Sequence, residues 1–241
     1  MKAFFIKNRL IYLFVLICCL SCGTDSEKLY HICTTYCPYY SLHTINTPQI
    51  NFINLVRTND KISFYCDSNE FKKSAVQYAK PSGYFAVYTG TTHFTAVDSK
   101  GDLRAEKEIQ LHSSECLSIF ALEDTHKKII LLSFKDNLVF PAKGKSMVRF
   151  INLSVESQIM ALRGNGYELI KDIHYQKSTP FFEVTNGYYN LICRNTTASS
   201  KQHFKTPIEL KPGHIYTVCS SGSAKGTQSK DSFHTSIIEN Y

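Results

Sequence analysis

The chain has 241 residues, of which 43% are hydrophobic and 20% charged, so it can bury one or two cores and is not disordered as a whole. Lys and Arg total 27 against 20 Asp and Glu, a net charge of +7, and this surplus forms no long basic run, which argues against a nucleic-acid partner. Trp is absent, but 15 Tyr and 16 Phe are present, a composition that favours strands over helices.

Residues 1–21 have the pattern of a secretory signal peptide. Three basic residues and no acidic residue precede an unbroken apolar run, Leu10–Leu20. That run is shorter than the roughly 20 residues needed to cross a bilayer, and it fits a signal-peptide core of about 7–15 residues. The sequence Cys-Leu-Ser-Cys-Gly at 19–23 resembles a bacterial lipobox. We therefore expect cleavage after Ser21 and lipidation of Cys22; the alternative is a plain signal peptide and a product without lipid.

Residues 22–47 are polar and rich in Tyr, and we expect them to be a tether. Four side chains in it offer a superficial zinc quartet, namely His31, Cys33, Cys37 and His43. Their spacing is not the paired CxxC of structural zinc sites, and the environment outside the cytoplasm is oxidising, so both features argue against zinc. A local Cys33–Cys37 disulfide, or no special role, are the alternatives. We assign no metal and no cofactor.

An internal repeat follows the tether. The opening Ile50–Leu55 recurs as Val148–Leu153 at an offset of 98, and Tyr78–Gly90 recurs as Tyr175–Gly187 at an offset of 97. A third match, between Leu117-Ser118-Ile119 and Tyr216-Thr217-Val218, has an offset of 99. Matches in the same order with little drift predict two copies of one domain, at residues 48–140 and 146–241.

Within each copy the hydrophobic pattern has a period of two, which predicts strands. Arg163-Gly164-Asn165-Gly166 supplies residues that tolerate positive φ and predicts a hairpin turn. Short strands separated by such turns indicate an all-β sandwich or barrel in each copy, and our expectation is two tandem immunoglobulin-like β-sandwich domains. We expect Asn54 and Asn152, at equivalent strand ends, to bond local backbone and fix the following turn.

The opening Val148-Arg149-Phe150-Ile151-Asn152-Leu153-Ser154, with the aromatic strand Phe181–Gly187 and the later Leu210–Val218, resembles a family of uncharacterised bacterial secreted domains that start with a V-R-F-x-N-x-S strand. The first copy departs from this pattern, with Asn51 where the motif has Arg. The resemblance implies a β-sandwich in a cell-envelope protein of the Bacteroidetes type. It implies no catalytic residues.

Six cysteines lie beyond the lipobox, and an even number outside the cytoplasm is typical of disulfides. Cys193 and Cys219 align with core positions of the first copy on neighbouring strands, so a Cys193–Cys219 bridge is one expectation. Free buried thiols are the other.

No motif places a catalytic set. The stretch Gly144-Lys145-Ser146 lacks the earlier glycine of a phosphate-binding loop, and neither a nucleophile elbow nor HExxH occurs. The recognition signal is aromatic: Tyr188 and Tyr189 follow a turn glycine and are candidates for ligand contact, because exposed aromatic rings stack on sugars and anchor protein contacts.

We therefore expect a non-enzymatic binding or structural module in the cell envelope, anchored by its N-terminal lipid in the outer membrane and either periplasmic or surface-exposed. Its expected partners are the membrane and a protein or glycan ligand. A carbohydrate-binding accessory lipoprotein of a polysaccharide-uptake system is the alternative.

Overall fold

The computed structural model describes residues 46–57, 61–67, 69–70, 75–155, 157, 159–196, 203–223 and 233–240. These residues form strands, turns and loops and contain no helix, as the composition predicted. Within this part of the chain, no helix has the length and apolar character needed to cross a membrane. Residues 47–241 form one compact unit, and residues 1–46 are assigned to another.

Nine strands come from the first repeat. They are β1 (Gln49–Asn54), β2 (Lys61–Cys66), β3 (Asn69–Glu70), β4 (Val76–Gln77), β5 (Pro81–Ala86), β6 (Gly90–Val97), β7 (Leu103–Leu111), β8 (Cys116–Glu123) and β9 (Ile129–Lys135).

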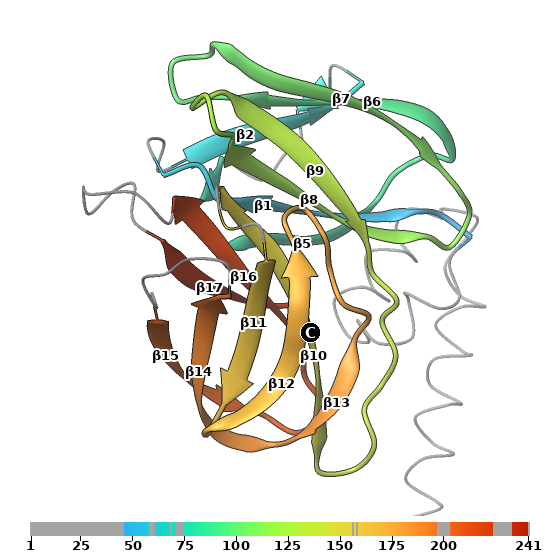
Figure 1. Ribbon diagram of the computed structural model, residues 1–241. Coiled ribbons are helices and arrows are strands. Elements are labelled where there is room, and N and C mark those ends of the chain that lie inside the picture. Colours follow the sequence, from blue (N-terminus) through green and yellow to red (C-terminus); the bar gives the residue numbers. More distant parts are fainter. Residues whose placement is uncertain are drawn as a thin grey trace, which may run out of the picture. The chain divides into compact units, whose positions relative to one another are not determined.

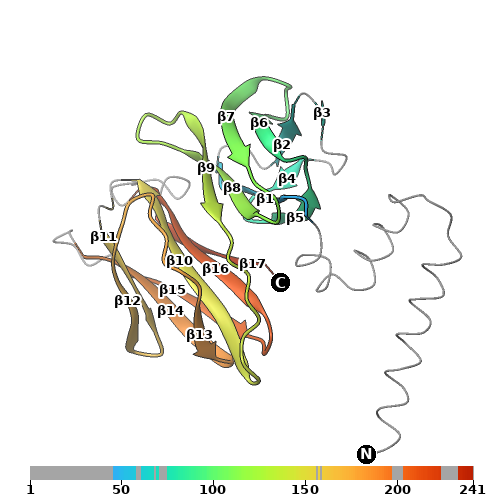
Figure 2. The same ribbon diagram turned by 90° about the vertical axis from the view of Figure 1, so that its right-hand side faces the viewer.

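Eight strands come from the second repeat. They are β10 (Lys145–Val155), β11 (Ile159–Gly164), β12 (Tyr167–His174), β13 (Phe182–Thr185), β14 (Gly187–Asn195), β15 (His203–Leu210), β16 (Ile215–Ser223) and β17 (His234–Glu239). In Figures 1 and 2 the blue-to-green strands form one group and the yellow-to-red strands form the other.

The two groups have the same strand order. The first contains a sheet β5-β1-β8-β9 and a second sheet β3-β2-β6-β7, with β4 pairing β2. The second contains β13-β10-β16-β17 and β12-β11-β14-β15. In each group the opening strand pairs in parallel with the strand of the third sequence match, so Phe52 lies opposite Ile119 and Phe150 opposite Val218. The repeat found in the sequence is thus a repeat of topology and register.

A separate hydrophobic core fills each sandwich. In the first repeat, Phe52 stacks on Phe64 of the facing sheet with ring centroids 4.3 Å apart. In the second, Phe150 and Val218 pack with residues of β11 and β14. Each core lies between two sheets because alternate side chains of every strand point to the same face.

A third cluster lies on the other face of the opening strands. This junction cluster contains side chains of both repeats, namely Ile53, Leu55, Phe120, Leu122, Ile151, Leu153, Cys219 and Ile238. All eight are 2% exposed or less, so the cluster is as dry as either sandwich core. Strands β1 and β10 are consequently buried on both faces. The junction cluster joins the repeats within one compact unit, and their division into domains at residues 140–146 stays a prediction.

The predicted hairpin turn is present between β11 and β12. Asn165 and Gly166 both have positive φ, 49° and 87°. Asparagine and glycine are the residues that adopt this conformation at least cost, which explains their choice here.

Candidate functional site

The most deeply buried charges of the described residues form an ion pair between the two repeats. Arg149 lies on β10, and Asp136 follows the last strand of the first repeat. Their side chains are 1% and 0% exposed, and Arg149 Nη2 lies 2.5 Å from Asp136 Oδ1. A buried charge is stable only with a close partner and further hydrogen bonds, so the surroundings of both residues decide what this pair does.

Arg149 donates two hydrogen bonds besides its ion-pair contact. Its Nε donates to Thr217 Oγ1 at 2.9 Å and its Nη1 donates to the Lys135 carbonyl at 3.1 Å. The guanidinium carbon also lies 4.7 Å from the centroid of the Phe181 ring, a cation–π geometry. These contacts come from both repeats and fix the planar group in one orientation.

The carboxylate of Asp136 is held from the other side. Tyr84 and Ser118 each donate a hydroxyl hydrogen bond of 2.7 Å to Asp136 Oδ2. Burial raises the pKa of the Tyr84 phenol well above its ordinary value, and the adjacent negative charge of Asp136 raises it further. Tyr84 therefore stays a neutral donor at physiological pH.

Asn240 closes this network, near the C-terminal end of the chain. Its Nδ2 donates to Tyr84 Oη at 3.1 Å, and its Oδ1 accepts from Thr217 Oγ1 at 2.6 Å. The network thus runs from the first repeat to the second and back through hydrogen bonds alone. We call Tyr84, Ser118, Asp136, Arg149, Thr217 and Asn240 the polar junction. Arg149 Nη2 and Asp136 Oδ1 are in ion-pair contact with each other and have no further hydrogen-bond partner in the described residues, so the pair holds the two repeats together.

Both repeated asparagines bond local backbone as predicted, but only Asn54 lies at a strand end, because β10 continues past Asn152 to Val155. Asn54 Oδ1 accepts the Val56 backbone N–H at 2.9 Å, and Asn152 Oδ1 accepts the Ser154 N–H at 3.1 Å. Each also donates from its side chain to backbone carbonyls, Asn54 to Val76 and Asn152 to Ser157 and Ile173. In the N-x-S part of the motif, Asn152 thus holds the backbone N–H of Ser154, two residues further along the chain.

The Cys193–Cys219 bridge is not formed. None of the four cysteines in the described residues is bridged, and both of these are fully buried. Cys193 lies in the core of the second sandwich, whereas Cys219 lies in the junction cluster on the opposite face of the β16 sheet. Its neighbour Val218 occupies the core face, so strand alternation separates the two sulfurs. Burial raises the pKa of both thiols to about 12, which makes them unreactive hydrophobic groups.

The candidate recognition residues Tyr188 and Tyr189 point to opposite faces of β14. Tyr188 is 77% exposed. Tyr189 packs against the second core and donates its hydroxyl to the Thr185 carbonyl at 2.8 Å. Only Tyr188 of the pair therefore offers its ring to a ligand, and ligand contact stays a prediction for it.

A second exposed tyrosine follows the turn that Asn165 bonds to the backbone of β14. Tyr167 begins β12 and is 78% exposed. Between them, Asn165 donates its side chain to the Tyr188 carbonyl and accepts from the Asn190 N–H, both at 3.0 Å. This amide fixes the hairpin turn against the backbone of β14.

The remaining predicted site residues lie outside the described residues. These are Cys22, the Cys33–Cys37 pair and the zinc quartet that includes His31 and His43. In the described part of the chain, no group of three or more His, Cys, Asp and Glu side chains is arranged to hold a metal ion.

Sequence reasoning missed the polar junction. Arg149 was recognised as part of a motif but given no partner, because Asp136 is its partner only after the two repeats pack together. One signal was available: a lone arginine in the apolar stretch Met147–Val155 requires a buried acid.

Comparison with known proteins gives a family similarity. A family model described as "Domain of unknown function (DUF4397)" matches residues 48–163. This range of the chain is thus similar to an uncharacterised domain family. The match covers the first repeat and extends through β10 and most of β11, so it includes both Asp136 and Arg149. The Bacteroidetes origin and the opening motif stay predictions. No curated protein matches the chain.

Solved structures give remote likenesses. The C-terminal domain of AlgF from P. aeruginosa is 20% identical over 40% of this chain and 99% of that chain, with a TM-score of 0.29. A family CBM26 module from Eubacterium rectale Amy13K, solved with maltoheptaose, is 12% identical over 79% of this chain and 95% of its own, with a TM-score of 0.25. A streptococcal virulence factor that binds alpha-glucan is 9% identical over 80% and 97%, with a TM-score of 0.26. At TM-scores below 0.5, these likenesses carry no conclusion about this chain.

Proposed function

We propose that this chain is a lipid-anchored protein of the bacterial cell envelope that acts without catalysis, as a binding or spacer module of two tandem immunoglobulin-like sandwiches. The lipid is attached at Cys22, in the lipobox-like sequence at 19–23. Several acyl chains anchor a protein stably, because each buried CH₂ contributes about 0.8 kcal/mol.

The observation that carries the proposal is the polar junction. Two sandwiches joined by a loop alone reorient freely, whereas these two share a dry cluster and a buried Arg149–Asp136 pair. Breaking such a pair costs several kcal/mol, so the second sandwich keeps its place against the first. A stiff body of this kind holds loops and sheet faces at a fixed spacing from its anchor, which suits display or spacing. The most deeply buried charges of the described residues thus serve to hold the two sandwiches together.

Cys22→Ser tests the anchor directly. We expect the parent chain to fractionate with membranes and to float with them in a density gradient, and we expect Cys22→Ser to remain in the soluble extracytoplasmic fraction. Cys33→Ser is the matched control, since it changes a cysteine outside the lipobox-like sequence and should leave membrane partition unchanged. Equal partition of Cys22→Ser and the parent would refute the proposal. Protease shaving of intact cells then separates a periplasmic from a surface-exposed location.

Carbohydrate binding is a second candidate function. The observation that favours it is the exposure of Tyr188 and Tyr167 on either side of the Asn165 turn. Exposed tyrosine rings stack on sugar faces, and the exposed amide of Asn190 nearby offers hydrogen bonds. A glycan array probed with the chain and with Tyr188→Ala tests this: binding that the substitution abolishes supports it, and uniform lack of binding dismisses it.

A further inference from the structure

Exposed apolar side chains lie on the segments that leave both edge strands of the β5-β1-β8-β9 sheet at the end where β1 begins. Six large hydrophobic side chains of the described residues are exposed. Three of them lie in the segments that follow β5 and β9, the two strands that end where β1 begins. They are Tyr88, Val139 and Phe140, which are 91%, 60% and 45% exposed. We call these three residues the apolar end.

Backbone hydrogen bonds place Tyr88 beside the start of β1. The Pro48 carbonyl accepts from the Val87 N–H at 3.0 Å, and Tyr88 is the next residue of the chain. On the other side of β1, Gln49 N–H donates to the Glu115 carbonyl at 2.7 Å. The chain that leads from residues 1–46 therefore joins the sandwich between Tyr88 and Glu115.

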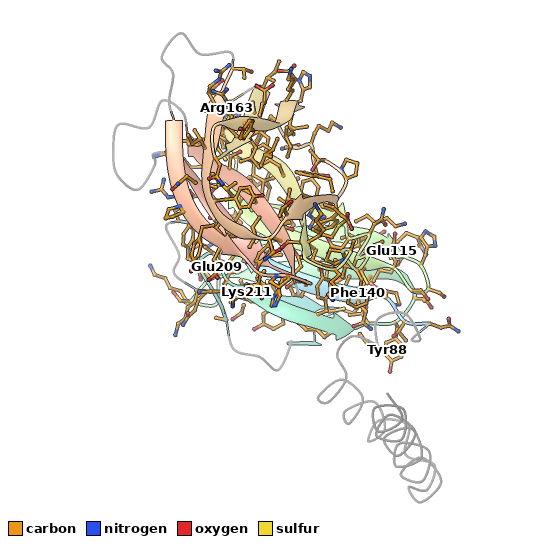
Figure 3. All side chains as sticks on the ribbon, turned by 90° about the horizontal axis from the view of Figure 1, so that it is seen from below. Tyr88, Glu115, Phe140, Arg163, Glu209 and Lys211 are labelled. Carbon is orange, nitrogen blue, oxygen red and sulfur yellow. The ribbon has the colours of Figure 1, made fainter. Side chains whose placement is uncertain are left out.

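The same bonds place the segment that carries Val139 and Phe140. Asp136 N–H donates to the Cys116 carbonyl at 2.7 Å, and Leu138 N–H donates to the Asp136 carbonyl at 3.0 Å. Cys116 pairs with Gln49, so this segment leaves the sheet at the row where β1 begins. Figure 3 labels Tyr88, Glu115 and Phe140 in one region, away from Arg163.

The charges at this end do not oppose contact with an anionic surface. Glu115 forms an ion pair with Lys135 at 2.8 Å, and Asp136 is buried against Arg149. Lys143, which follows Phe140 in the same segment, is exposed; so is Glu183, whose Oε1 accepts the Ala142 N–H at 2.7 Å, and these two opposite charges leave no net negative charge on the segment. The end thus combines two aromatic rings, an aliphatic side chain and a lysine, and tyrosine, other aromatic residues and lysine are typical of the membrane–water interface.

We propose that the apolar end is a membrane-contact surface, in which Tyr88 and Phe140 enter the headgroup region of the bilayer that holds the lipid of Cys22. This inference rests on the proposed anchor at Cys22. The anchor and the apolar end are joined by residues 23–47, which span at most about 90 Å when fully extended. The chain enters the folded unit at this end, so among the sheet ends it lies closest to the attachment point of the tether, and the exposed side chains determine whether it docks.

The absence of tryptophan from the sequence gives a direct test. Tyr88→Trp and Tyr188→Trp each place one fluorophore in the full-length lipidated chain, at positions that are 91% and 77% exposed. Both variants are reconstituted into vesicles of equimolar phosphatidylcholine and phosphatidylglycerol, with and without brominated acyl chains. We expect Tyr88→Trp emission to shift to shorter wavelength and to lose intensity with brominated lipid, and we expect neither change for Tyr188→Trp.

Each other outcome overturns the inference in a distinguishable way. If the chain floats with the vesicles but Tyr88→Trp behaves as Tyr188→Trp, then the anchor stands and the membrane-contact surface does not. Equal quenching of both variants would mean that contact is not confined to this end. If the full chain does not float, or if Cys22→Ser floats equally well, then the anchor itself fails. Flotation is read independently of fluorescence, so the two failures are told apart.

Discussion

Asn51 and Arg149 occupy equivalent positions in the two repeats, but their side chains have different hydrogen-bond partners. Both lie on the face of their strand that carries Ile53 or Ile151 into the junction cluster, and both are 1% exposed. Arg149 is paired with Asp136 and donates two further hydrogen bonds. Asn51 accepts a long 3.3 Å bond from Ser82, and its Nδ2 finds no hydrogen-bond partner in the described residues.

The difference shows that the repeats are complementary rather than equivalent. The second repeat supplies the cation and the first supplies the anion and its two hydroxyl donors, Tyr84 and Ser118. A junction of this kind can form in only one register, because a shifted register would bury an unpaired charge. The buried pair thus selects the arrangement of two otherwise similar sandwiches.

The largest expected effect comes from breaking the pair on one side. Arg149→Met keeps the bulk of the side chain but leaves the Asp136 carboxylate buried without its cation. We expect the free energy of unfolding to fall by about 3–5 kcal/mol, measured by urea denaturation. Adding Asp136→Asn to this variant should restore part of the loss, because it removes the unpaired charge. If the two substitutions were strictly additive, Arg149 and Asp136 would not be coupled.

Asn152→Ala should cost somewhat less. Besides its two backbone donations, Asn152 Oδ1 accepts from Ser154 N and from Ser220 Oγ, both at 3.1 Å. Loss of these bonds in a buried site is expected to lower the free energy of unfolding by about 2–3 kcal/mol. The exposed Asn190→Ala is the matched control and should change it by less than about 0.5 kcal/mol. Equal effects of the two substitutions would contradict a stabilising role for the Asn152 bonds.

Alkaline pH should weaken the fold through Cys193 and Cys219. Burial raises the pKa of each thiol from 9.0 to about 12. Below pH 9 both states keep these protons; between pH 9 and pH 12 the unfolded chain releases them while the folded chain retains them. The free energy of unfolding therefore falls as the pH rises through this window, by about 1 kcal/mol per thiol at pH 10.

Urea denaturation at pH 8 and pH 10 measures this loss. The variant Cys193→Ala/Cys219→Ala should lose less stability than the parent on going to pH 10, and a remaining part should come from Cys66, Cys116 and Tyr84, whose pKa values are also raised. The same loss in both proteins would show that the two thiols do not contribute.

The smallest effect is expected at Asn51, the counterpart of Arg149. Asn51→Val removes an amide whose nitrogen is unpartnered in the described residues and leaves a side chain of suitable size for the junction. Replacing an unsatisfied buried polar group by an apolar one is close to neutral, so the free energy of unfolding should change by less than about 1 kcal/mol. A loss comparable to that of Arg149→Met would remove the contrast between the repeats.

Local patterns in the sequence were sufficient for the repeat, the all-strand fold and the turn at Asn165-Gly166, because turn chemistry and strand alternation act over a few residues. They were also sufficient for the local backbone bonds of Asn54 and Asn152, although Asn152 lies inside β10 and not at the predicted strand end. The assignment of each group to the immunoglobulin-like class and the anchor at Cys22 stay predictions.

The sequence did not show which face of a strand each side chain lies on, or which residues far apart in the chain form pairs. Alignment of the repeats placed Cys193 and Cys219 on plausible core positions but did not distinguish the two faces of β16. The Asp136–Arg149 pair depends on how one sheet packs on another. The dense burial of β10, where every residue after Lys145 is buried, has a trace in its apolar sequence, since strands covered on both faces are hydrophobic at successive positions.

Scanning calorimetry of the chain tests most directly whether the two repeats form one body. The account predicts a single cooperative transition for the parent chain, with a calorimetric enthalpy equal to the van't Hoff enthalpy, because the junction cluster and the polar junction couple the two sandwiches. It predicts that Arg149→Met lowers the transition temperature and broadens or splits the transition. Two separate transitions in the parent chain, unchanged by Arg149→Met, would contradict it.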